Sequence, residues 1–216
     1  MLMILRLFAN KKRKLSFTCS NVPPTLTMLA NSTVCPPVKK LSASRNLLID
    51  VNPDFPFQFT ALDGDGAGLT LVQNREWGIW SGKLSFTAAA ATLNRTDIRR
   101  PSITLNASPD TLSISELSAF TENGLLDATA SIDQTPARHL NLQLTGKGVP
   151  LNILNHWGWP EPPLQGDGNL QLSLQGAIAA DKPLATGINA TLRVTDQQGH
   201  QAEQTMVNGQ IGRAHV

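Results

Sequence analysis

A pattern of alternating apolar and polar residues occurs twice in this chain, and both copies end at a glycine. Residues 140–146 read Leu-Asn-Leu-Gln-Leu-Thr-Gly, and residues 169–176 read Asn-Leu-Gln-Leu-Ser-Leu-Gln-Gly. A period of two residues predicts β-strands that have one apolar and one polar face. Repetition of the unit predicts a sheet that grows by the addition of similar strands.

Short strand patterns continue over residues 46–210, with turn signals about every 8–12 residues, which is typical of a many-stranded antiparallel sheet. We therefore predict a mainly β fold, built as a curved, repetitive antiparallel sheet that is either an open groove or sandwich-like. Asn123-Gly124 is a strong turn signal, and Asp63-Gly64-Asp65-Gly66 and Ser81-Gly82 are also predicted to be turns. Pro56, in a segment of alternating phenylalanines, predicts an edge strand.

One segment departs from this rhythm and predicts a short helix near residues 150–157. It has a proline near its start and Gly158 at its end, the order expected of a helix. Leu151 and Leu154 would share one face of it, three residues apart. The proline-rich residues 160–163 prevent the helix from continuing.

The charges are distributed unevenly along the 216 residues, a length that allows one large or two small domains. Residues 1–45 hold eight Lys or Arg and no acidic residue, whereas residues 46–210 hold nine Lys or Arg and all 16 Asp and Glu. We therefore separate a basic N-terminal segment, 1–45, from a β-rich region, 46–210. The β-rich region is acidic and has no basic stripe with interleaved aromatic residues, which argues against a nucleic-acid partner.

The two ends of the sequence are interpreted separately from the fold. Arg6 interrupts the apolar start and a basic run follows it, so residues 1–45 predict neither a signal peptide nor a membrane-spanning helix. They are either the incidental start of a truncated or misframed reading frame or a short membrane-surface arm. Residues 211–216 resemble one reading frame of a common sequencing adapter and are predicted to be a scar. A disulfide between Cys19 and Cys35 stays open.

The residue types that catalysis or metal binding requires are not grouped in the sequence. Residues 63–66 fail as a calcium loop, because the twelfth position of the loop would be Asn74, where a carboxylate is needed. His156 is interpreted as a capping or surface group of the predicted helix. The two cysteines form no Cys/His cluster with metal-ligand spacing. We expect a protein that is not an enzyme and that has no catalytic residue, metal or cofactor.

Several segments together resemble the repeated β units of AsmA-family proteins, which are envelope proteins of Gram-negative bacteria. The resemblance covers roughly residues 50–210. It lies in the segments Gly148–Leu154, Trp157–Pro160, Leu164–Leu172 and Ala179–Asp181, with further similarity in Arg100–Leu105 and Leu117–Glu122.

The resemblance implies an inner-membrane anchor, a periplasmic body, and a long curved β groove that carries or shields lipid acyl chains. Family members are linked to outer-membrane assembly and to phospholipid transport between the two membranes. This sequence shows no anchor and no N-terminal lipid-entry domain, so it resembles an internal or C-terminal fragment. The implied partners are phospholipid acyl chains and envelope proteins that the sequence does not identify.

The candidate lipid-facing residues are the leucines of the two repeated segments, which we call the leucine rows: Leu140, Leu142, Leu144, Leu170, Leu172 and Leu174. Two interpretations of what covers these rows remain open. Another layer of the protein would make them an ordinary core, whereas an open sheet would let acyl chains lie along them. Each methylene buried there contributes about 0.8 kcal/mol.

Two further classes of protein remain as alternatives. A surface adhesin or carbohydrate-binding β module is motivated by the strands rich in Thr and Asn and by tryptophans such as Trp159 that could stack on sugars. Packing in the core is the other interpretation of these tryptophans. A secreted hydrolase on a β scaffold is the weakest alternative, because no pair of acidic residues is singled out for the chemistry.

Overall fold

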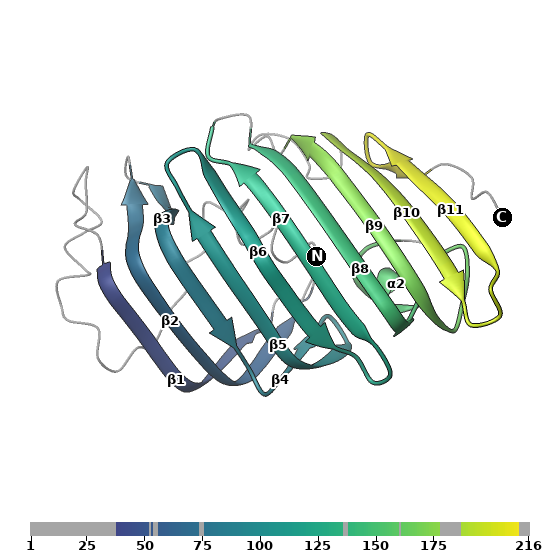
Figure 1. Cartoon of the computed structure of the whole chain (residues 1–216), viewed down its shortest axis with the longest axis horizontal. Coiled ribbons are helices and arrows are strands. Elements are labelled where there is room, and N and C mark those ends of the chain that lie inside the picture. The colour runs from purple at the N-terminus through teal and green to yellow at the C-terminus, as the bar shows by residue number, and fades with distance from the viewer. Residues whose placement is uncertain are drawn as a thin grey trace.

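The computed structural model describes residues 38–51, 53, 56–73, 76–135, 138–159, 161–177 and 187–211. Within these residues the chain forms one twelve-stranded antiparallel sheet and one short helix (Figure 1). The mainly β prediction is therefore confirmed, and the helix lies within the predicted segment. The elements are β1 Val38–Asp50, β2 Phe57–Gln73, β3 Glu76–Thr87, β4 Ala90–Leu93, β5 Thr96–Ala107, β6 Thr111–Phe120, β7 Leu125–Asp133, β8 His139–Pro150, α2 Ile153–His156, β9 Asp167–Ala177, β10 Ile188–Asp196, β11 Gln201–Val207 and β12 Gln210–Ile211.

The strands lie across the sheet in the order in which they occur in the chain, with β4 as the exception (Figure 1). β4 pairs with the first residues of β2 and of β5, whereas β3 pairs with later residues of the same two strands. β4 therefore continues the path of β3 between β2 and β5. The break between them falls at Ala88 and Ala89.

The strands β7 to β11 form the regular half of the sheet, in which side chains alternate between two faces except at a register shift between Gly146 and Val149. β8 shows the alternation directly, because its residues 139–146 are exposed and buried by turns. No register shift interrupts the β7–β8, β9–β10 or β10–β11 pairs. One register row on the exposed face is entirely hydroxyl or amide in character: Thr129, Gln143, Ser173, Thr191 and Thr205.

The strands β1 to β5 form the creased half of the sheet, in which a line of irregular positions crosses neighbouring strands. Arg45, Ala61 and Arg100 have positive φ values of 52°, 48° and 48°, and they lie at the same level as the break between β3 and β4. Backbone bulges of this kind bend a strand and increase its twist. Figure 1 shows the lower ends of these strands turning behind the rest of the sheet.

The buried apolar side chains fall into three clusters, and the largest lies under the regular half. It contains the leucine rows together with apolar residues of β10 and of the α2 region. The creased half has two smaller clusters, one around Phe57 and Phe59 and one around Leu69 and Leu84. The main core therefore lies where the sequence alternates most regularly.

Two turn predictions were wrong, because both segments lie inside strands. Residues 63–66 belong to β2 and pair with β1 on one side and with β3 on the other. The glycines serve packing: a Cβ added at Gly64 would lie 2.6 Å from the Phe86 ring, and one at Gly66 would lie 2.7 Å from the Leu69 side chain. Ser81 and Gly82 lie within β3, where Gly82 has a φ of 104° and passes close to the β2 backbone.

The edge position predicted from Pro56 was also wrong. Pro56 precedes β2, so its missing N–H removes no bond from the ladder, and β2 itself is an interior strand that pairs on both sides. The carbonyl oxygen of Pro56 accepts a hydrogen bond from the Asn94 backbone N–H at 2.8 Å.

The predicted segment boundaries can be compared with the described residues only in part. β1 begins at Val38 and so includes the last residues of the basic segment 1–45. The rest of that segment lies outside the described residues, and with it the Cys19–Cys35 bridge. Ile211 belongs to β12, and the remaining residues of the predicted scar, 212–216, also lie outside the description.

Candidate functional site

The leucine rows form a continuous aliphatic surface because the register of the sheet aligns them across strands. Leu142 faces Leu174, and Leu144 faces Leu172, across the β8–β9 pair. The next strand extends both rows, since Leu172 faces Leu192 and Leu174 faces Ala190. Directly opposed residues in an antiparallel pair have Cβ atoms about 4.5–5.5 Å apart, so these side chains are in contact.

All six leucines of the rows are buried, with exposed fractions between 1 % and 5 %. They belong to the same cluster as the apolar side chains of the segment that connects β8 to β9. We call this segment the flap; it comprises residues 151–159 and 161–166 and includes α2. The side chains that it contributes to the cluster are Leu151, Ile153, Leu154 and Trp159. In this structure the protein's own side chains therefore pack on the leucine rows.

The flap leaves the sheet and returns to it at one place. Pro150, the last residue of β8, pairs with Asp167, the first residue of β9. The backbone N–H of Leu151 donates to the carbonyl oxygen of Gly166 at 2.8 Å, which joins the two ends of the flap. The short α2 follows because a helical turn brings Leu154, three residues after Leu151, to the same buried side.

The far end of the flap is bonded to the turn between β4 and β5. The Nδ2 of Asn94 donates to the carbonyl oxygen of His156, and the Oγ1 of Thr96 lies 3.1 Å from the Nδ1 of His156. The Nε1 of Trp157 donates to the carbonyl oxygen of Leu93 at 3.3 Å. We call these three contacts the clasp. The crease makes them possible, because it turns the β4–β5 hairpin toward the flap.

A buried polar pair interrupts the aliphatic surface near β11. The Nε1 of Trp159 donates to the Oε1 of Gln204 at 2.7 Å, and the two residues are 5 % and 6 % exposed. Gln204 faces Leu192 across the β10–β11 pair, so it stands at the end of a leucine row. The bond satisfies an indole N–H that burial would otherwise leave unpaired.

Trp159 is buried and Trp157 is half-buried, as the core interpretation of the tryptophans expected. The sugar-stacking surface that the adhesin alternative required at Trp159 is absent, because this side chain is 5 % exposed. The sequence predicted the helix of the flap. It did not reveal the clasp, which joins residues about 60 positions apart.

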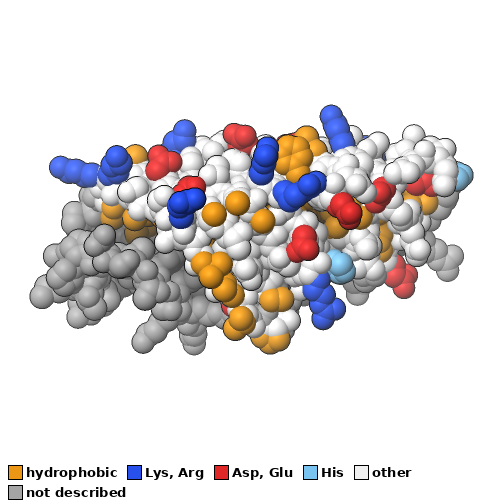
Figure 2. All heavy atoms as spheres, turned by 90° about the horizontal axis from the view of Figure 1, so that it is seen from below, with side chains coloured by type: hydrophobic (Ala, Val, Ile, Leu, Met, Phe, Trp, Pro, Cys, Tyr) orange, Lys and Arg blue, Asp and Glu red, His pale blue; other side chains and the backbone are white. Residues whose placement is uncertain are grey.

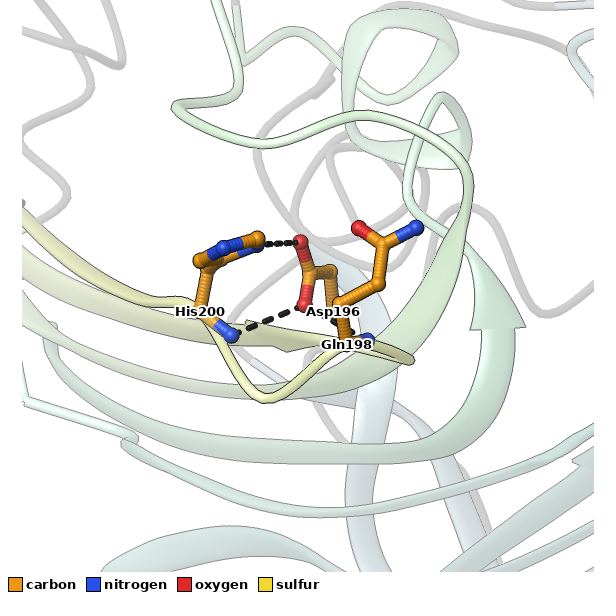
Figure 3. A network of polar contacts seen from close by, with 3 residues as sticks. All are labelled: Asp196, Gln198 and His200. Atoms are coloured by element: carbon orange, nitrogen blue, oxygen red, sulfur yellow. Dashed lines mark hydrogen bonds and ion pairs between the residues drawn. The ribbon is translucent and has the colours of Figure 1, made fainter.

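A network of polar contacts holds the turn between β10 and β11 (Figure 3). One carboxylate oxygen of Asp196 accepts hydrogen bonds from the backbone N–H groups of Gln198 and His200, each at 2.9 Å, and the other lies 2.7 Å from the Nδ1 of His200. Burial raises the pKa of Asp196, but the hydrogen bonds and the charge of His200 outweigh it, so this pKa lies below its ordinary value. The network fastens the turn between β10 and β11.

The exposed face of the sheet carries charges of both signs. In the view from below, Lys and Arg side chains project mainly from the upper margin (Figure 2). Arg193 and Glu203 form an exposed ion pair with a 2.6 Å contact.

Among the described residues, no three His, Cys, Asp or Glu side chains are grouped as a metal would require. No helix in the same residues is both long and apolar enough to cross a bilayer.

These features define a class of protein: a long, repetitive antiparallel sheet with one aliphatic face and one polar face. A scan against protein-family models finds no match, and no solved structure matches the chain. Among curated proteins, the chain is similar to the AsmA family protein YicH of Escherichia coli (strain K12), with 54 % identity over 179 residues. The alignment covers 83 % of this chain and 32 % of that protein.

The chain therefore belongs to the AsmA family, as the resemblance of its repeated strand units predicted. Membership of this family indicates an envelope-related protein. It spans about a third of the length of the curated relative that it matches.

Proposed function

We propose that this chain handles lipid in the periplasm as part of an AsmA-like protein that the inner membrane anchors. The leucine rows serve phospholipid acyl chains during transport toward the outer membrane or during its assembly, and the chain catalyses no reaction. The observation that carries the proposal is the aliphatic surface of β8 to β10, which is continuous across three strands.

Aliphatic packing supports an acyl chain as the ligand. Leucine side chains offer no directional bonds, so they favour a hydrocarbon over a polar ligand. An acyl chain that buries ten methylenes gains about 8 kcal/mol. Displacing one buried leucine of the flap into water costs about 1.5–3 kcal/mol, so an acyl chain offsets the loss of several such contacts.

The first experiment tests lipid binding without altering the protein. The full chain is purified from a Gram-negative host, extracted with organic solvent, and analysed for phospholipid by mass spectrometry. A phospholipid with a photoactivatable acyl chain is then cross-linked to the delipidated protein, and the labelled residues are mapped. We expect copurified phospholipid, with labels on β8, β9 and the flap.

A matched pair of variants separates the two faces of one strand. Leu172→Ala lies in a leucine row and Gln171→Ala lies next to it on the exposed face. We expect cross-linking to fall several-fold in Leu172→Ala and to stay unchanged in Gln171→Ala, with circular dichroism as the check on folding. Labels confined to the exposed face, or protein that neither copurifies with lipid nor takes up the probe, would overturn the proposal.

A further inference from the structure

The flap is built as a hinged cover. Its two ends meet where Pro150 pairs with Asp167, and the Leu151–Gly166 backbone bond joins them just beyond the sheet. A rotation about this base moves the whole flap and leaves the β8–β9 ladder paired. Among the described residues, and apart from the base, the polar bonds that tie the flap to other elements are those of the clasp and the Trp159–Gln204 pair.

The underside of the flap is chemically similar to the ligand that we propose for the leucine rows. Leu151, Ile153 and Leu154 are at most 2 % exposed and present aliphatic groups to the core cluster. Contacts of this kind are not directional, so the hydrocarbon of an acyl chain can replace them. The clasp differs, because hydrogen bonds need defined partners and Thr96 is itself buried at 6 % exposure.

The geometry points to a lid: the flap opens about its base to admit a phospholipid acyl chain to the leucine rows, and the clasp holds it closed. This inference rests on the proposed function and adds the route by which the ligand enters. The four residues of the clasp then control how fast the lipid binds, although none of them belongs to the leucine rows. They are Asn94, Thr96, His156 and Trp157. These four are positioning residues.

The test weakens the clasp from the hairpin side. Asn94→Gly removes the donating amide and suits the local φ of 43°, and Thr96→Val removes the hydroxyl with little change of shape. The two substitutions are combined in one chain of 216 residues. Thr92→Val is the matched control, because its hydroxyl lies on the same hairpin and bonds to Asp97, away from the flap.

Two readouts are compared among wild type, the double variant and the control. Hydrogen exchange followed by mass spectrometry reports opening of the flap without any ligand, and stopped-flow fluorescence reports uptake of a phospholipid with a fluorescent acyl chain. Each hydrogen bond contributes modestly to holding the flap closed. We therefore expect the rate of amide hydrogen exchange in the flap and the rate of phospholipid uptake to rise on the order of tenfold in the double variant. Exchange in β8 and β9 should stay unchanged, and Thr92→Val should match wild type.

The outcomes separate the lid from the proposed function. Unchanged flap exchange in the double variant would overturn the lid, whatever the lipid result. Faster exchange with uptake equal to wild type would also overturn it, because the flap would then not control entry, and the proposed function would stand. If no protein takes up the probe, the proposed function fails and the lid has no ligand to admit.

Discussion

The regular half and the creased half of the sheet show how the same antiparallel pairing gives two different shapes. In the regular half most strand pairs keep their register, and the alternation of the side chains breaks at the register shift between Gly146 and Val149 of the β8–β9 pair. In the creased half the β1–β2, β2–β3 and β5–β6 pairs each contain register shifts, near residues with positive φ. The regular half therefore holds one large core, and the creased half holds two small ones and supplies the hairpin that reaches the flap.

The largest expected effect comes from a cavity in each core. Leu192 is fully buried in the large cluster, and Leu84 is 6 % exposed in a smaller one. We expect Leu192→Ala to lower the free energy of unfolding by about 3–5 kcal/mol and Leu84→Ala by about 2–3 kcal/mol. Urea denaturation followed by circular dichroism measures both. An equal or larger loss for Leu84→Ala would show that the size of the cluster does not set the cost.

A smaller effect is expected at the buried polar pair of the regular half. Trp159→Phe leaves the Oε1 of Gln204 without its donor and should lower the free energy of unfolding by about 1–3 kcal/mol. Adding Gln204→Leu should recover part of the loss, because the unpaired amide is removed. Trp157→Phe, the control, loses a longer bond at a half-buried site and should cost less. Additive losses in the double variant would contradict the pairing.

Glycine substitutions compare backbone strain in the creased half with that in the regular half. Ala61 in the crease has a φ of 48°, which is unfavourable for a residue with a Cβ, whereas Ala128 lies in regular β7. We expect Ala61→Gly to raise the free energy of unfolding by roughly 0.5 kcal/mol and Ala128→Gly to lower it by about 1 kcal/mol. The same urea titration measures both. A loss of stability in Ala61→Gly would show that the crease is not strained there.

The smallest effect is a pH dependence at the turn between β10 and β11. The pKa of Asp196 is lowered below its ordinary value of 3.8 in the folded protein, so the turn's contribution to stability is present above that value. The contribution is lost as the pH falls through the lower, folded-state pKa. Asp196→Asn should flatten the dependence of unfolding free energy on pH in this acidic range. Identical profiles for the variant and wild type would remove the role assigned to the network.

The regular half could be predicted from the sequence more fully than the creased half. The alternation at residues 140–146 and 169–176 predicted both strands and the shared face of the leucine rows, because period and pairing agree there. Asp63-Gly64-Asp65-Gly66 misled, because its glycines make room for Phe86 on the neighbouring strand β3 and for Leu69 further along β2, and a turn-like composition does not reveal this packing. The clasp depends on backbone bulges at Arg45, Ala61 and Arg100, none of which is a residue type that announces a bulge.

The sequential order of the strands has a consequence for how the chain acquires its structure. Neighbours in the sheet are, with β4 aside, neighbours in the chain, so most hairpins close over a short loop, and the flap between β8 and β9 is a longer connection. A polypeptide that emerges end first can add its strands one at a time, each on the edge left by the last. The β4–β5 turn, in contrast, must wait for a segment that is synthesised some sixty residues later.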